Sequence, residues 1–235
     1  MESFMRFRLS ISLNTRGSHW RSHGIGSDPV FLKIPEKEGI KMRIENIREY
    51  TDNEKILGMA ENCLKQIDES GSPESKYELA ILLEELHNKN LNEDIFELFK
   101  GAAEDDANSG ALLKLSKYYH AGRGCQRNIA RSFAYCYEAA RLGDLDAETY
   151  LAQIFRDDWR ELALYWAEHA GNRNDPQALM IAGDLLDRLG ATRKNGQKYY
   201  DGATRCYEKA ASLGVAGAKN KVTVLGKLLR VLRFS

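Results

Sequence analysis

Helix-breaking and metal-binding residues are scarce in this sequence. It contains 4 prolines and 4 cysteines among 235 residues, and no cysteine forms a CxxC pair or stands close to a histidine. A zinc site or redox motif is therefore not indicated, and we expect no metal and no cofactor. The scarcity of proline, together with abundant Ala, Leu, Glu and Lys, favours helix over strand.

Long apolar runs are missing as well. A membrane-spanning helix needs about 20 consecutive, mostly apolar residues, and no run in this chain approaches that length. The apolar stretch Leu9–Leu13, which follows Arg6 and Arg8, is too short and too polar for a signal peptide. We therefore expect a cytoplasmic protein with no stable membrane insertion.

The chain has no net charge, with 34 Lys and Arg against 34 Asp and Glu, but its charges are segregated. Residues 1–41 carry 7 basic and 4 acidic residues, and residues 216–235 carry 5 basic residues and no acidic one. The middle of the chain, residues 42–215, is acidic, with 22 basic against 30 acidic residues. Such a body lacks the basic surface typical of nucleic-acid binding, so no nucleic-acid partner is expected.

Residues 1–41 show neither helical nor strand periodicity and are rich in Ser, Gly, Arg and His. This composition is typical of a disordered segment. Codons for Lys37–Gly39 can also form a bacterial ribosome-binding sequence, shortly before Met42. Two interpretations stay open: a flexible basic tail, or a leader in front of a true start at Met42. The mass of the natively expressed protein separates them, because a product that begins at Met1 contradicts the second.

A repeated pattern follows this segment. Its clearest unit has small residues where two helices must approach closely and glycines in the turns. The unit is marked by Ala111, Leu115, Tyr119, Gly122, Gly124, Tyr135, Ala139, Ala140, Gly143 and Ala147. Units begin at Ser75, Ala111, Ala147, Ala178 and Ala218, at spacings of 36, 36, 31 and 40 residues. A reduced loop at Asp157–Asp158 accounts for the short spacing, and an insertion around 192–198 for the long one. Asn174 stands where Gly143 stood, and asparagine is the next most tolerant residue for a left-handed helix cap.

These residues resemble the Sel-one-like repeat family, a variant of the tetratricopeptide repeat. The resemblance covers about residues 56–218, with departures at Ser116, Cys125 and Ser132. The units at 75–111 and 147–178 lack the Gly-x-Gly loop of the family. The resemblance implies an all-α fold, an α-α superhelix in which two-helix hairpins stack as a right-handed solenoid.

Periodicity and helix caps independently predict helices. They are expected near residues 53–69, 74–88, 91–104, 108–121, 128–142, 145–156, 158–171, 175–189, 196–213 and 216–233. Because one hairpin cannot bury its apolar face alone, the hairpins must share a continuous core. We expect the repeats to occupy residues 42–215 and residues 216–235 to form a basic amphipathic helix that caps them. Docking of that helix to a membrane or a partner is the alternative.

No catalytic constellation is apparent. None of the 5 histidines stands beside a Ser, Cys or carboxylate pattern that reads as a nucleophile with its base. We expect His169 to be a half-exposed surface residue and His120 to interact with the last carbonyls of its helix. The loop Gly122–Gly124 joins two helices and does not follow a strand, so it is not a phosphate loop. We expect no catalytic residues and no enzyme activity.

Binding is the expected function. In tetratricopeptide-like stacks the first helix of each hairpin lines the concave face, where exposed side chains would meet a protein or peptide partner. The candidates are Tyr77, Glu78, Ile81, Lys114, Lys117, His120, Gln153, Arg156, Asp184 and Arg188, with Glu84, Thr149 and Ile181 on the same expected face. These residues predict a non-enzymatic scaffold or adaptor. The alternatives are a bacterial effector or toxin-immunity protein that also acts by binding, and an uncharacterised enzyme.

Overall fold

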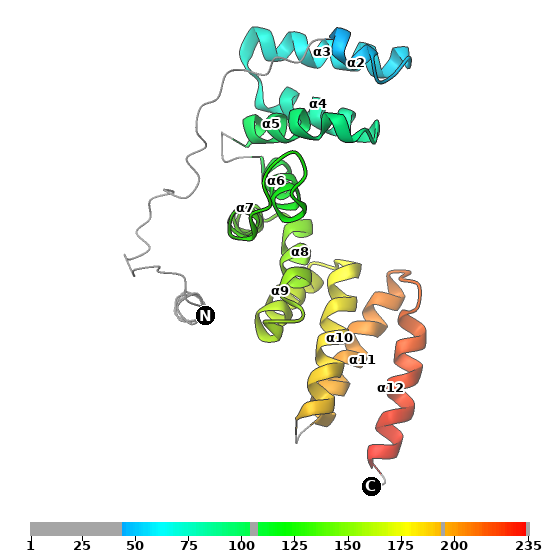
Figure 1. Ribbon diagram of the computed structural model, residues 1–235. Coiled ribbons are helices and arrows are strands. Elements are labelled where there is room, and N and C mark those ends of the chain that lie inside the picture. Colours follow the sequence, from blue (N-terminus) through cyan, green and yellow to red (C-terminus); the bar gives the residue numbers. More distant parts are fainter. Residues whose placement is uncertain (1–43, 104–107, 194–195, 234–235) are drawn as a thin grey trace, which may run out of the picture. The chain divides into compact units, whose positions relative to one another are not determined.

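The computed structural model of this protein describes residues 44–103, 108–193 and 196–233. All regular structure within these three ranges is helical (Figure 1). The all-α fold class predicted from the sequence is therefore confirmed. The tail or leader expected at residues 1–41 lies outside the described residues.

Consecutive helices pair into hairpins. After α2 (Ile44–Arg48) and α3 (Glu54–Ser70), the pairs are α4 (Pro73–Glu85) with α5 (Asn92–Ala102), α6 (Ser109–Ala121) with α7 (Ile129–Arg141), α8 (Leu145–Phe155) with α9 (Arg160–Asn172), and α10 (Pro176–Thr192) with α11 (Gly196–Ser212). A single helix, α12 (Ala218–Arg233), follows. Each α-helix packs against the next one in the sequence. We call α4, α6, α8 and α10 the first helices, and α5, α7, α9 and α11 the second helices.

Every helix expected from periodicity is present, with ends that differ by a few residues. Two short elements were not expected. The helix α2 buries Ile47, and a 3-10 turn, η2 (Lys89–Leu91), buries Leu91 in the loop between α4 and α5. Both elements are shorter than two helical turns, so they carry too few residues for a periodic pattern to reveal them.

The first helices share one capping arrangement. In each of them a side-chain oxygen before the helix accepts a hydrogen bond from the backbone N–H three residues later. The pairs are Ser72 with Ser75, Asn108 with Ala111, Asp144 with Ala147, and Asp175 with Ala178. The small residues that mark the repeat thus lie in the first turn of each first helix. All of them are buried, which explains why the pattern requires them to be small.

Asn174 confirms the expected substitution of asparagine for glycine at a hairpin end. Its φ is +67°, and the corresponding Gly143 has φ +87°. Left-handed backbone is costly for residues with a Cβ, and asparagine tolerates it better than most. The turn lets Asp175 donate its backbone N–H to Ala170 O at 3.2 Å, which closes the end of α9.

Gly183 lets the last hairpin close. A Cβ at this position would lie 2.5 Å from a ring carbon of Tyr207, whose hydroxyl donates to Asp184 Oδ1 at 2.6 Å. We expect Gly183→Ala to lower the free energy of unfolding by about 1–2 kcal/mol, since overpacking a core outweighs the gain in helix propensity. Urea denaturation measures this change.

Gly58 provides the control for that substitution. It lies in the interior of α3, is exposed, and nothing lies within 4 Å of a Cβ placed there. Gly58→Ala should therefore raise the free energy of unfolding by about 0.5–1 kcal/mol, the propensity difference alone. Equal effects of the two substitutions would show that Tyr207 does not press on α10.

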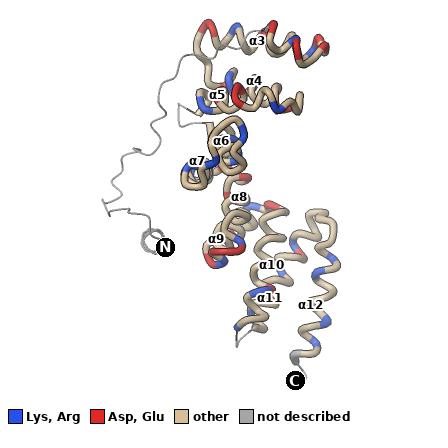
Figure 2. Tube along the Cα trace, in the orientation of Figure 1, with Lys and Arg blue, Asp and Glu red and all other residues tan. Residues whose placement is uncertain are grey.

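The helix α12 packs on the last hairpin through its apolar side. Leu225 is buried with Leu186 and Tyr207, and Val222, Leu228 and Leu229 pack against the same cluster. Val224 and Val231, two further apolar residues of α12, are exposed. Lys and Arg residues run along α12 without any Asp or Glu (Figure 2). These are the contacts expected of a capping helix, although the capping role and the division of the sequence at residue 215 stay predictions.

Candidate functional site

The exposed side of the first helices, which we call the first-helix face, carries the predicted partner-binding residues. Five of them are exposed: Glu78, Lys117, Gln153, Arg156 and Arg188. The other five are partly buried: Tyr77, Ile81, Lys114, His120 and Asp184. Thr149 and Ile181 were also expected to be exposed on this face, and that expectation is wrong. Both are buried, because the neighbouring hairpins cover the sides of α8 and α10 on which they lie.

Glu84 joins α4 to α6 on this face. Lys114 forms an ion pair with Glu84 Oε2, and the hydroxyl of Tyr118 donates to Glu84 Oε1 at 3.0 Å. The ammonium of Lys114 also lies 5.7 Å from the centre of the Phe99 ring. Burial and the adjacent carboxylate of Glu84 raise the pKa of Tyr118 well above its ordinary value, so this hydroxyl stays a donor.

Tyr150 joins α6 to α8 in the same way. Its hydroxyl lies 2.6 Å from His120 Nδ1, and the ammonium of Lys117 lies 5.4 Å from the centre of its ring. His120 was expected to interact with the last carbonyls of its own helix. That expectation is wrong, because the ring nitrogen reaches the next hairpin and the carbonyl of His120 instead accepts a hydrogen bond from Arg127 Nε at 3.0 Å.

Asp157 and Asp184 continue these links toward the C-terminal end. Arg188 Nη1 of α10 lies 3.3 Å from Asp157 Oδ1, in the loop after α8. Asp184 Oδ1 accepts hydrogen bonds from Lys221 Nζ of α12 at 3.0 Å and from the hydroxyl of Tyr207. Six of the predicted residues therefore fall into two groups. Lys114, His120 and Arg188 join neighbouring hairpins, and Asp184 joins the last hairpin to α12. Gln153 and Arg156 project from the face without contacting the next hairpin in any interaction of the described residues.

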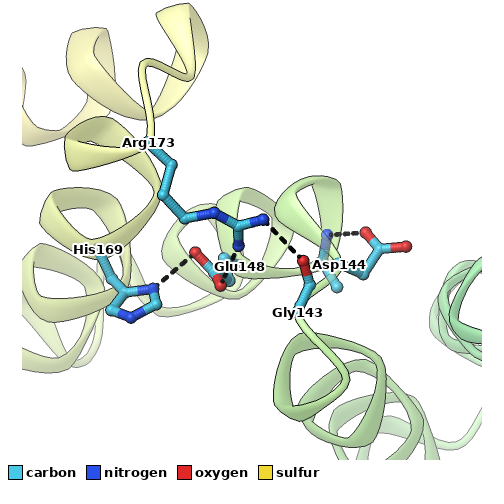
Figure 3. A network of polar contacts seen from close by, with 6 residues as sticks. Gly143, Asp144, Glu148, His169 and Arg173 are labelled. Carbon is cyan, nitrogen blue, oxygen red and sulfur yellow. Dashed lines mark hydrogen bonds and ion pairs between the residues drawn. The ribbon is translucent and has the colours of Figure 1, made fainter.

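A buried carboxylate between α8 and α9 was not predicted. The side chain of Glu148 is 1% exposed and lies between His169 and Arg173 (Figure 3). His169 Nδ1 lies 2.8 Å from Glu148 Oε2, and Arg173 Nη1 donates to Glu148 Oε1 at 2.9 Å. Arg173 Nη2 also donates to Gly143 O at 3.0 Å, so its guanidinium fastens the end of α7 to α9. His169 is about half exposed, as expected, but its role is to pair with Glu148.

A patch of aromatic rings on α7, α8 and α9 was missed as well. Neighbouring ring centres in this patch lie 5.3–6.4 Å apart. All of these rings are partly exposed except that of Trp166, which is buried. We call the following residues the aromatic patch: Phe133, Tyr137, Phe155, Trp159, Tyr165 and Trp166. The sequence could have indicated this patch, because aromatic residues four apart, such as Phe133 and Tyr137, lie on the same side of a helix.

Neither a metal-binding cluster nor a membrane-spanning helix occurs in the part of the sequence that the structure describes. Within residues 44–103, 108–193 and 196–233, no group of three or more His, Cys, Asp or Glu is placed to hold a metal ion. In the same part of the sequence, no helix combines the length and the apolar character needed to cross a membrane.

Buried titratable side chains of α7 and α8 should make the free energy of unfolding depend on pH in the alkaline range. Burial raises the pKa of Cys136 from 9.0 to about 12, and those of Tyr135 and Tyr150 from 10.0 to about 12. In the unfolded protein these groups ionise from about pH 9 to 10, whereas the folded protein keeps them neutral. The free energy of unfolding should therefore be independent of these groups below about pH 9 and fall as the pH rises toward about 12. Urea denaturation at a series of pH values from about 8 to about 11 checks this, and a constant midpoint would contradict it.

Comparison with known proteins agrees with this architecture. No protein-family model and no curated protein matches the sequence. Among similar solved structures, a Sel1 repeat protein from Oxalobacter formigenes has a TM-score of 0.58 at 20% identity, over 74% of this protein and 71% of that one. A protective antigen present in uropathogenic Escherichia coli strains, which displays an SLR fold, has a TM-score of 0.56 at 20% identity, over 69% of this protein. The match spans only 36% of that antigen. The protein thus has the Sel-one-like repeat fold, a solenoid of helical hairpins, as its sequence pattern predicted.

Proposed function

We propose that this protein is a cytoplasmic, non-enzymatic bacterial adaptor that binds a partner protein or peptide on the first-helix face. Helical-repeat proteins of this fold are interaction scaffolds, and each hairpin adds one first helix to a continuous surface. The observation that carries the proposal is the division of this face into linking and projecting side chains.

The linking residues make the face rigid. Glu84 with Lys114, His120 with Tyr150, and Asp157 with Arg188 each join two neighbouring hairpins. A surface held in this way loses little conformational freedom when a partner binds, which favours affinity. The projecting residues Gln153 and Arg156, together with the exposed Lys117, whose ammonium lies over the Tyr150 ring, supply polar and charged groups that a partner's helix or extended segment can reach.

The proposal is tested by comparing what two variants capture from a lysate of the native cells. The first replaces the exposed Lys117, Gln153 and Arg156 of the first helices by Ala, and leaves the link between Glu84 and Lys114 intact. A matched control replaces two exposed cations and one amide of the second helices by Ala: Arg160, Arg205 and Asn172. We expect the first variant to lose, by about tenfold or more, a partner that the wild-type protein and the control both retain. Equal recovery by both variants would contradict the proposal.

A further inference from the structure

A cavity of 220 Å³ opens where the α4–α5 loop meets the loop after α6. Its polar lining includes Glu84, Lys89, Asn92, Tyr118 and Arg123. These residues come from two consecutive hairpins, so the cavity belongs to the stack and not to a single hairpin. We call it the loop pocket.

The one carboxylate that lines the loop pocket is already occupied. Both oxygens of Glu84 are engaged, one by the ammonium of Lys114 and the other by the hydroxyl of Tyr118. Lys114 also neutralises the charge of Glu84. A ligand in the pocket therefore finds no free anion to pair with.

The two cations that line the loop pocket are differently placed. Neither Lys89 nor Arg123 forms an ion pair with any acidic residue in the described part of the sequence. The guanidinium of Arg123 lies 5.4 Å from the centre of the Tyr118 ring, a contact that leaves its N–H donors available. The side chain of Glu97, by contrast, is paired with Lys100 at 2.8 Å, outside the pocket.

The backbone beside the pocket fixes the loop that carries Arg123. The helix α5 begins at Asn92, directly after the 3-10 turn η2, and its first turn holds the acidic Glu93 and Asp94. The loop that presents Arg123 is fixed against this turn, because Gly124 packs directly on the peptide between Asn92 and Glu93. Arg123, the residue before Gly124, is therefore held at the pocket by this contact.

We infer that the loop pocket binds a carboxylate of the partner protein through Arg123 and Lys89. This inference rests on the proposed function and names the chemistry that the partner presents. The guanidinium can hold a carboxylate by two parallel hydrogen bonds, and the ammonium of Lys89 adds a second charge. The carboxylate comes either from an Asp or Glu side chain or from the C-terminus of a polypeptide, and the pocket volume suits either.

The test titrates the isotope-labelled, full-length protein with three N-acetylated tripeptides and follows the backbone amides of Asn92 and Arg123 by NMR. The peptides are Ala-Glu-Ala amide, Ala-Ala-Ala with a free carboxylate, and Ala-Ala-Ala amide as the neutral probe. We expect saturable shifts with one or both acidic peptides and none with the neutral one, and which acidic peptide binds identifies the source of the carboxylate. Binding should weaken at high salt, since exposed charges are screened.

Variants show whether the named cations are responsible. Arg123→Gln and Lys89→Gln should each weaken binding about tenfold, because each removes a charge-assisted hydrogen bond. Arg123→Lys, which keeps the charge, should retain more affinity than Arg123→Gln, and the control Arg160→Gln should bind like the wild type. Equal shifts with the neutral peptide, or unchanged binding by Arg123→Gln, would overturn the inference.

The outcome is separable from that of the proposed function. If no acidic peptide binds but the first-helix variant still loses its partner, the loop pocket has no role and the adaptor proposal stands. If acidic peptides bind the pocket but the first-helix variant retains every partner, the pocket is a carboxylate site on a protein whose docking surface lies elsewhere.

Discussion

Replacing Gly124 by Ala should lower the free energy of unfolding by about 3 kcal/mol. Gly124 has φ +62°, in the left-handed region that costs other residues about 1–2 kcal/mol. In addition, a Cβ at Gly124 would overlap Asn92 O and lie 2.8 Å from Glu93 N. These are backbone atoms of the preceding hairpin, so no side-chain rotation relieves the overlap, and overpacking adds about 1–3 kcal/mol.

Gly143→Ala is the matched control for this substitution. Gly143 also has a positive φ, of +87°, but nothing lies within 4 Å of a Cβ placed there. Gly143→Ala should therefore lower the free energy of unfolding only by the cost of the left-handed backbone, about 1–2 kcal/mol. Urea denaturation of both variants separates backbone strain from the close approach of two hairpins. Equal losses would show that the loop at Gly122–Gly124 does not press on α5.

Replacing Arg173 by Met should lower the free energy of unfolding by about 3 kcal/mol. It leaves the carboxylate of Glu148 buried, at 1% exposure, with only His169 beside it. Removing one partner of a buried ion pair is costly because the other charge stays without water. The hydrogen bond from Arg173 to Gly143 O is lost as well. Chemical denaturation measures the change.

Two comparisons sharpen that prediction. Glu148→Gln should cost less, about 1 kcal/mol, because the side chains it leaves behind, Arg173 and His169, are 44% and 52% exposed and can be hydrated. Arg193→Met, which breaks the surface pair with Glu161, should change stability by less than about 0.5 kcal/mol. A loss for Arg173→Met no larger than that for Arg193→Met would contradict the structural role of Glu148.

The fold was predictable because the repeat constrains the sequence at every hairpin. Ala111, Ala147 and Ala178 are fully buried in the first turns of first helices, where no larger side chain fits. Asn174 adopts the same left-handed backbone as Gly143, so the sequence alone was enough to predict that these two hairpin ends are equivalent. The short elements α2 and η2 were not predicted, because they are stabilised by burial against longer helices and have no periodic pattern of their own.

The candidate site was predictable only in part. Helical spacing placed Gln153 and Arg156 on the exposed side of α8, but it also placed Thr149 there, which is buried. Spacing along one helix does not tell which of its sides the next hairpin covers. Glu148 was not predicted for a related reason. Its partners lie on α9 and just after it, 21 and 25 residues later in the sequence. A glutamate in the first turn of a helix is typical of a surface position.

The aromatic patch is the rival to the first-helix face. Partly exposed aromatic rings are enriched at protein interfaces, and Phe155 and Trp159 lie at the turn that leads into α9, a second helix. A partner bound there would approach α9 and leave α6 and α8 open. The two surfaces can therefore be distinguished by the position at which a bound partner comes close to this protein.

Site-specific photocrosslinking in the native cells tests the central claim most directly. A photoreactive phenylalanine analogue is placed either at Gln153, on the first-helix face, or at Arg160, beside the aromatic patch; both positions are exposed. If the first-helix face is the docking surface, Gln153 gives a covalent adduct with a partner protein and Arg160 gives none. An adduct from Arg160 alone would contradict this proposal and assign binding to the second helices.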